Sequence, residues 1–188
     1  ANPDYWEGSF KGQPQIGTLI FRPITEASTR ISELIAGGVD MIQDLPPDQI
    51  QTLVNAGLVV KSGVTPNLTY FLVTSDDPES PFSDVRVRQA INYAVDIQAI
   101  IDTLLLGFGA PIASPIGPSN LGYDSGIEPY PYDLDMARSL LEEAGYADGF
   151  AVTMDVCTCD RNDLALAVAG QLAEVGITVE LREIELGQ

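Results

Sequence analysis

The strongest constraint on this chain is a helical pattern of apolar residues between positions 81 and 107. Asp84 precedes the first apolar residue of the stripe, Val87, and a short carboxylate there can accept hydrogen bonds from the free amides of a first helical turn. Asp96 stands in the same relation to a second apolar run, which Gly107 ends. The pattern therefore predicts two consecutive helices, over residues 84–95 and 97–106. Their apolar stripes comprise Val87, Ala90, Ile91, Ala94, Val95, Ile97, Ile100, Ile101, Leu104 and Leu105.

The opposite face of the first helix is polar. It carries two of the chain's nine basic residues on a single turn. From the pattern alone, this face is interpreted as solvated. Its residues are Arg86, Arg88, Gln89, Asn92 and Tyr93.

Periodicity divides the rest of the chain into an α/β sequence. Short β-branched runs predict strands, helical stripes predict helices, and glycine and proline separate them. Residues 62–67 are rich in turn formers and favour a boundary between two parts of the chain. The predicted strands are residues 16–24, 39–42, 58–61, 68–74, 150–156 and 177–181, and the predicted helices are residues 26–37 (begun by Thr25), 47–57, 134–144 (begun by Asp133) and 163–175.

The chain is strongly acidic, with 27 acidic residues, 9 basic residues and a net charge of −18. It lacks the basic surface that displaces counterions from a nucleic acid, and an anionic membrane surface would repel it. No apolar run approaches the ~20 residues of a membrane-spanning helix. The first residues show no signal-peptide pattern. We therefore expect no nucleic-acid partner and no membrane span.

Cys157 and Cys159 are the two cysteines of the chain. In an extended segment their side chains point to the same side, with Cα atoms near the ~6.8 Å upper limit for a disulfide. A zinc site would need two further ligands, and the sequence has no histidine and offers only Asp155 and Asp160 nearby. We therefore expect reduced, metal-free thiols, with a strained disulfide as the alternative.

The sequence lacks the common catalytic motifs. Without histidine or a G-x-S-x-G segment, no hydrolase triad of the common type can be assembled. The G-x-x-x-x-G-K pattern of a phosphate-binding loop is also missing. Neither an enzymatic activity nor a cofactor is therefore predicted.

Five segments of the sequence together resemble one known family. They are residues 2–6 (NPDYW), 36–40 (AGGVD), 81–96 (PFSDVRVRQAINYAVD), 132–150 (YDLDMARSLLEEAGYADGF) and 171–177 (QLAEVGI). In order and spacing these segments are similar to those of the extracytoplasmic solute-binding proteins of the oligopeptide/dipeptide/nickel family (family 5). Such proteins are the capture components of ABC importers.

The resemblance implies an α/β fold of the periplasmic-binding-protein type (class II, oligopeptide-binding), with a mixed sheet flanked by helices. Residues 1–65 would belong to the first lobe and residues 66–188 to the second lobe. Because proteins of this family are much longer, the chain is interpreted as an internal fragment. Such a fragment is expected to bind the solute weakly and to self-associate through apolar surface that further segments would cover.

The function implied by the resemblance is that of a substrate-binding component of an ABC transporter. It would capture oligopeptides or a related solute outside the cytoplasmic membrane, in the periplasm or lipid-anchored at the outer face, and deliver them to the permease subunits. Two alternatives remain. The chain is a freestanding α/β interaction module without a transport role, or it binds a saccharide or a nickel chelate.

Ligand-binding candidates lie where predicted strands end, because open α/β sheets bind ligands at the carboxyl ends of their strands. Thr74 and Ser75 end one strand, and Thr158, Asp160 and Arg161 follow another. The resemblance implies that the second loop faces the ligand cleft, where Arg161 can pair with a ligand carboxylate. An equally weighted alternative is that Arg161 is simply an exposed arginine near the start of a helix. The family usually has asparagine where Thr74 stands, so a hydroxyl replaces an amide.

Overall fold

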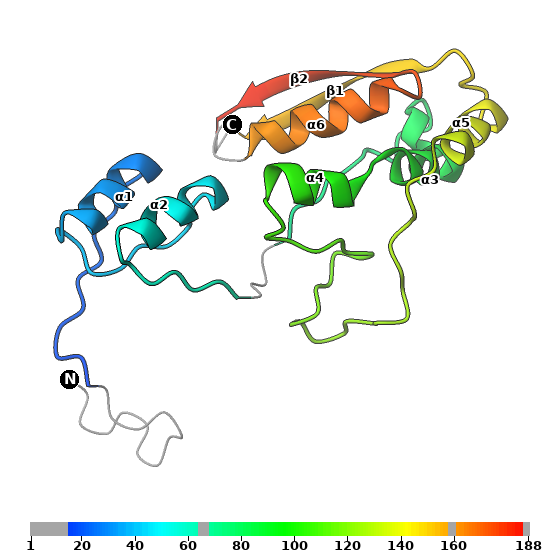
Figure 1. Ribbon diagram of the computed structural model, residues 1–188. Coiled ribbons are helices and arrows are strands. Elements are labelled where there is room, and N and C mark those ends of the chain that lie inside the picture. Colours follow the sequence, from blue (N-terminus) through cyan, green and yellow to red (C-terminus); the bar gives the residue numbers. More distant parts are fainter. Residues whose placement is uncertain (1–14, 64–67, 158–160, 186–188) are drawn as a thin grey trace. The chain divides into compact units, whose positions relative to one another are not determined.

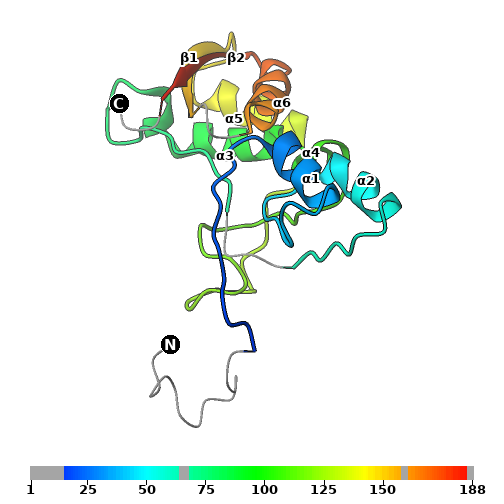
Figure 2. The same cartoon turned by 90° about the vertical axis from the view of Figure 1, so that its left-hand side faces the viewer.

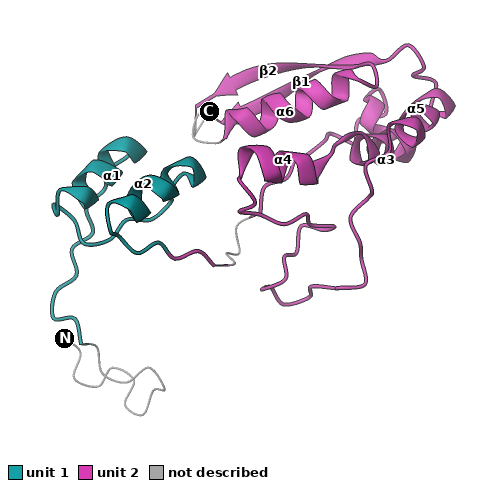
Figure 3. Ribbon diagram, viewed as in Figure 1, with its two compact units in different colours: residues 1–60 teal, residues 61–188 magenta. Residues whose placement is uncertain are grey.

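The computed structural model describes residues 15–63, 68–157 and 161–185 (Figure 1). The chain divides into two compact units, residues 1–60 and residues 61–188 (Figure 3). Each unit is described by itself. The assignment of residues 1–65 and 66–188 to two lobes stays a prediction.

The first unit contains two short α-helices. Helix α1, Ala27–Ile35, begins after Glu26 rather than after Thr25, and no side chain caps it. The 3₁₀ helix η1, Pro47–Gln49, leads into α2, Ile50–Asn55. Among the described residues of this unit, Ile31 and Leu53 alone are buried apolar side chains. The unit therefore has a very small core of its own.

Arg30 connects the two segments that flank α1. Its Nη1 donates to the carbonyl oxygens of Ile24, at 2.9 Å, and Thr25, at 2.7 Å, and its Nη2 donates to the carbonyl oxygen of Asp44 at 3.1 Å. A guanidinium can do this because it holds five donors in one plane. Polar contacts thus complement the small apolar core.

The strands predicted over residues 16–24, 39–42, 58–61 and 68–74 are wrong, because the described residues of these segments form neither helix nor strand. A strand satisfies its backbone groups only by pairing with a neighbour. No described residue supplies that neighbour here, although the side chains have strand character. Ile20 and Phe21 are 80% and 84% exposed as a result.

The second unit begins with the helices that the sequence predicts most strongly. The 3₁₀ helix η2, Pro81–Ser83, leads into α3, Val85–Ala94, and α4, Ile97–Leu104, follows directly. Asp84 Oδ1 accepts from the amide of Arg86 at 2.8 Å, and Asp96 Oδ1 accepts from the amide of Ala99 at 2.9 Å. Both predicted caps are therefore confirmed.

The remainder of the second unit consists of a helix followed by a β-α-β unit. Helix α5, Leu134–Glu143, is capped by Asp133 as predicted. Strand β1, Phe150–Cys157, and strand β2, Ile177–Ile184, pair in parallel from Phe150 opposite Ile177 to Cys157 opposite Ile184. Helix α6, Asn162–Ala173, connects them and lies along the sheet in both views (Figure 1, Figure 2). The described sheet has parallel strands only, whereas a mixed sheet was expected.

One apolar core holds the second unit together. It joins α3, α5, α6 and β2, and the predicted inward stripe of α3 is confirmed because Val87 is fully buried while Ile91 and Val95 pack against the core. Burial of this area is the main favourable term in folding. The buried members are Val87, Ala90, Ala94, Ala137, Leu141, Val168, Leu172, Val175 and Ile177.

Gly149 and Gly176 lie against each other where the two strands begin. Their φ angles are +75° and +86°, in the left-handed region that glycine adopts without penalty. The amide of Phe150 donates to the carbonyl oxygen of Gly176 at 3.2 Å. A Cβ at Gly149 would overlap that oxygen and lie 2.7 Å from the carbonyl carbon. The start of the sheet therefore requires glycine at position 149.

Candidate functional site

The candidate site is the edge of the sheet where β1 and β2 end. Because the strands are parallel, Cys157 and Ile184 lie opposite each other at this edge. Helix α6 begins there at Asn162. The carboxyl ends of parallel strands are the usual place for a ligand in an α/β fold.

Arg161 lies at this edge, and its neighbours there include Asp163 and Leu104. Its Nε donates to Asp163 Oδ1 at 2.9 Å, its Nη2 also contacts Asp163 Oδ2, and Nη2 donates to the carbonyl oxygen of Leu104 at 3.2 Å. The hydrogen bond from Arg161 lowers the pKa of the Asp163 carboxyl group. Arg161 therefore connects the start of α6 to the end of α4, and a ligand carboxylate would compete with Asp163 for the guanidinium.

A hollow of about 260 Å³ lies at this edge, lined by residues of α6, β1 and β2. Val156, Leu166 and Leu181 give it apolar walls, and Asn162 and Glu183 are its polar members. Asn162 Nδ2 donates to Glu183 Oε1 at 2.8 Å. Sequence reasoning missed this pair, because the contact depends on β2 ending beside the start of α6. The hollow is smaller than the ~300–1,000 Å³ of typical ligand pockets, so it fits part of a solute.

The other predicted site residues are not brought to this edge by any described contact. Thr74 and Ser75 are exposed, and neither is hydrogen-bonded to a described residue. Thr158 and Asp160 lie outside the described residues. A ligand role for these four residues stays a prediction.

Cys157 is disulfide-bonded, which corrects the expectation of reduced thiols. The sequence supplies Cys159 as its second cysteine, and that residue lies outside the described part of the chain. The expectation rested on a Cα separation near the upper limit for a disulfide, and such a separation does not exclude the bond. Within the described ranges, no group of three or more Cys, Asp or Glu side chains is arranged to hold a metal ion.

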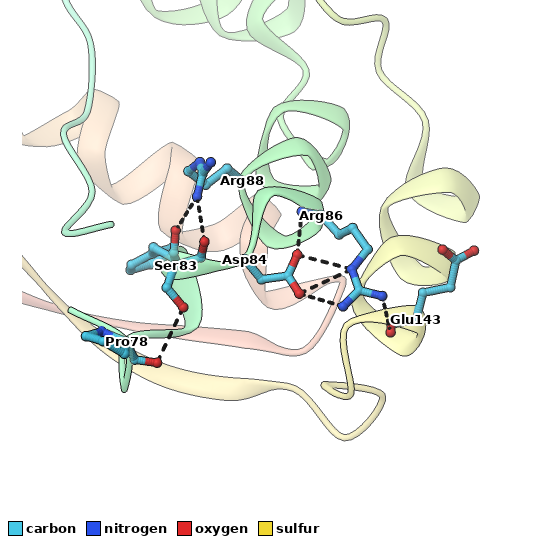
Figure 4. A network of polar contacts seen from close by, with 7 residues as sticks. Pro78, Ser83, Asp84, Arg86, Arg88 and Glu143 are labelled. Carbon is cyan, nitrogen blue, oxygen red and sulfur yellow. Dashed lines mark hydrogen bonds and ion pairs between the residues drawn. The ribbon is translucent and has the colours of Figure 1, made fainter. Parts of the chain in front are cut away.

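The polar face of α3 is occupied by structural contacts rather than being fully solvated. Arg86 donates from Nε and Nη2 to the Asp84 carboxylate and from Nη1 to the carbonyl oxygen of Glu143 at 2.6 Å (Figure 4). Arg88 Nη1 donates to the carbonyl oxygens of Phe82 and Ser83 at 2.7 and 3.0 Å. Both arginines are therefore only partly solvated, because their guanidinium groups are held by these acceptors.

These contacts make the Asp84 carboxylate a pH-dependent element. Hydrogen bonds from the Arg86 side chain and amide lower the pKa of Asp84 to about 2. The pKa of an aspartate in an unfolded chain is ~3.9. The folding stabilisation from the ionised Asp84 is therefore complete above that pH and is lost as the pH falls toward 2. We expect Asp84→Asn, which keeps a capping oxygen, to be less stable than the wild type at neutral pH.

The measurement is urea unfolding, followed by circular dichroism, at several pH values. The stability difference between the wild type and Asp84→Asn should shrink from about pH 5 to about pH 2. Asp76→Asn is the matched control because Asp76 is exposed and has no described hydrogen-bond partner. A pH-independent difference for Asp84→Asn would contradict the assignment.

None of the helices in the described residues has the length and apolar character needed to cross a lipid bilayer.

Comparison with protein families identifies the class to which this chain belongs. Residues 1–188 match the model for the middle part of bacterial extracellular solute-binding proteins, family 5. The chain belongs to this family. The family assignment made from the five segments is thereby confirmed, and the family consists of binding proteins rather than enzymes.

Individual relatives give the same result. The chain is 30% identical over 189 residues to the glutathione-binding protein GsiB of Salmonella choleraesuis (strain SC-B67). The matched region covers 98% of this chain and 35% of GsiB. It is 29% identical over 188 residues to GsiB of Escherichia coli (strain K12), with the same coverage. The chain thus spans about a third of the length of these curated relatives.

Solved structures confirm the fold class. The periplasmic binding protein DppA of Helicobacter pylori, in complex with the peptide STSA, superimposes with a TM-score of 0.73 at 27% identity, over 88% of this chain and 32% of DppA. HbpA2 of Haemophilus parasuis superimposes with a TM-score of 0.70 at 30% identity, over 98% of this chain and 36% of HbpA2. The α/β periplasmic-binding-protein fold, in part, is therefore shown.

Proposed function

We propose that this chain contributes the middle part of the substrate-binding component of an ABC importer. The component would capture an oligopeptide outside the cytoplasmic membrane and deliver it to permease subunits. The observation that carries the proposal is the family match along the whole chain. A peptide is favoured because GsiB is named for glutathione, itself a tripeptide, and DppA was solved with the peptide STSA.

The proposed contact surface is the sheet edge that contains Arg161. A peptide carboxylate matches the guanidinium fork, and the contact strengthens when water is excluded. In the chain alone the edge faces solvent, so we expect weak binding. Residues 1–65 and 66–188 would contribute to two lobes, and closure of such lobes over a ligand increases its burial.

Two alternative functions, binding of another solute and a freestanding interaction role, make different predictions. A saccharide or nickel-chelate binder would not depend on a peptide carboxylate. A freestanding interaction module would bind none of these solutes. A ligand panel therefore separates the three.

The test uses amide NMR spectra of the nitrogen-15-labelled chain titrated with the peptide STSA, glutathione, a disaccharide and a nickel chelate. We expect the peptides to bind at about millimolar affinity, with the largest shifts at the ends of β1 and β2. Arg161→Gln should weaken peptide binding about tenfold, which is ~1.4 kcal/mol. Arg138→Gln, which removes another exposed arginine of the same unit, should leave it unchanged.

A response to the disaccharide or the chelate alone would replace the peptide assignment. No response to any ligand would favour the freestanding module. Equal losses of peptide affinity in Arg161→Gln and Arg138→Gln would show that Arg161 does not contact the peptide carboxylate.

A further inference from the structure

Arg161 and Asp163 form an ion pair at the edge of the sheet where the proposed solute contact lies. Arg161 Nε donates to Asp163 Oδ1 at 2.9 Å and Nη2 contacts Asp163 Oδ2, so the aspartate occupies one two-pronged side of the guanidinium. The two side chains are 44% and 45% exposed. A ligand carboxylate that takes this side of the guanidinium must displace Asp163, and the displaced carboxylate then loses its arginine partner.

This displacement separates ligands by what they offer to Asp163. A ligand that brings only a carboxylate leaves Asp163 beside a second negative charge, whereas a ligand that also brings a cation pairs with it. Glu183, near the end of β2, adds another carboxylate to this edge. Asp155 and Arg182 lie opposite each other in the sheet and neutralise one another through bonds of 2.7 and 2.8 Å. These described charges favour a ligand that carries a cation beside its carboxylate.

The hollow of about 260 Å³ lined by α6, β1 and β2 suits a long basic side chain. Its apolar walls match the methylene stem of a lysine, and Glu183, one of its polar members, matches the ammonium. Asn162 also lines the hollow and follows Arg161 directly in the chain, so the hollow adjoins the ion pair. Asn162 Oδ1 is buried and accepts no hydrogen bond from a described residue. A buried acceptor without a donor is unfavourable, and an ammonium carries donors only.

We propose that this edge selects peptides whose carboxyl-terminal residue is lysine. The inference rests on the proposed peptide contact at Arg161 and adds the side chain that the edge prefers. The peptide carboxylate replaces Asp163 on Arg161, the lysine stem enters the hollow, and the ammonium pairs with the carboxylates of Asp163 and Glu183. Asp163 is thus a specificity-determining residue, because it disfavours a carboxylate that arrives without a cation.

The experiment is an amide NMR titration of the nitrogen-15-labelled chain with four peptides. STSK should bind about tenfold more tightly than STSA, from which it differs only in its last residue. KTSA has the same net charge as STSK but carries its lysine at the other end, so it should bind within about threefold of STSA. STSK with an amidated carboxyl terminus should bind about tenfold more weakly than STSK, although the acidic chain attracts this more cationic peptide more strongly.

Two matched aspartate variants test the role of Asp163. Asp163→Asn should reduce the preference for STSK over STSA to less than about threefold, because a neutral amide pairs less strongly with an ammonium than a carboxylate does. Asp135 provides the control, since it is likewise the second residue of its helix and pairs with Arg138 at 3.4 Å. Asp135→Asn removes the same charge and should keep the full preference. Circular dichroism checks that both variants retain the fold.

Binding of STSA and STSK with equal affinity would overturn this inference and leave the proposed function intact. Binding of KTSA as tight as that of STSK would show attraction to net charge alone, which would also overturn it. So would an unchanged lysine preference in Asp163→Asn. Absence of binding by all four peptides would contradict the proposed function itself, and this inference with it.

Discussion

Replacing Gly149 by alanine should destabilise the second unit by roughly 3 kcal/mol or more. Part of this loss comes from holding a non-glycine residue at φ +75°, which costs ~1–3 kcal/mol. The larger part comes from the added Cβ, which would overlap the carbonyl oxygen of Gly176. Backbone atoms cannot yield as a flexible side chain can, so β1 and β2 would have to separate at their first residues.

Urea unfolding of the chain, followed by circular dichroism, measures this effect. Gly170→Ala is the matched control, because Gly170 lies within α6 and a Cβ there meets no atom within 4 Å. Alanine is the better helix former, so this variant should gain about 0.5–1 kcal/mol. The proposed role of Gly149 would be refuted if both variants changed stability in the same direction by similar amounts.

Leu141→Ala should cost about 3 kcal/mol, within the ~2–5 kcal/mol range for leucine truncation in a core. Leu141 is 2% exposed and lies in the same cluster as Val87, Leu172 and Ile177. Truncation removes contacts with the core that α3, α5 and α6 share. Because those helices pack around this cluster, the remaining cavity cannot close by moving one of them alone.

The same unfolding experiment tests this variant. Leu166→Ala provides the control on α6, since its side chain is 61% exposed and its loss should cost less than ~1 kcal/mol. If the two leucine variants were equally stable, the core of the second unit would not be centred on Leu141.

Local signals were sufficient to predict the helices and the paired strands. Asp84, Asp96 and Asp133 cap their helices because a cap depends on residues only two or three positions away. The alternation in β1 and β2 was informative because α6 covers one face of the sheet. Residues 68–74 have equally strong strand character, but a strand also requires a partner, and sequence periodicity does not reveal one.

The candidate site was only partly predictable for a similar reason. The position of Arg161 at a strand end followed from the α/β pattern, whereas its bond to Leu104 joins residues 57 positions apart. Arg86 shows the same limit, since its bond to the Glu143 carbonyl oxygen also spans 57 positions. A helical wheel places Arg86 on a polar surface, and it contains no information about the acceptor of its hydrogen bond.

The disulfide at Cys157 has a consequence for where this polypeptide can mature. Cytosolic thioredoxin and glutathione systems keep thiols reduced, whereas the periplasm and the extracellular space allow disulfides to form and persist. The bond lies at the last residue of β1, directly beside the edge of the sheet that holds Arg161. Oxidative folding is therefore a condition for this edge to reach its native covalent structure.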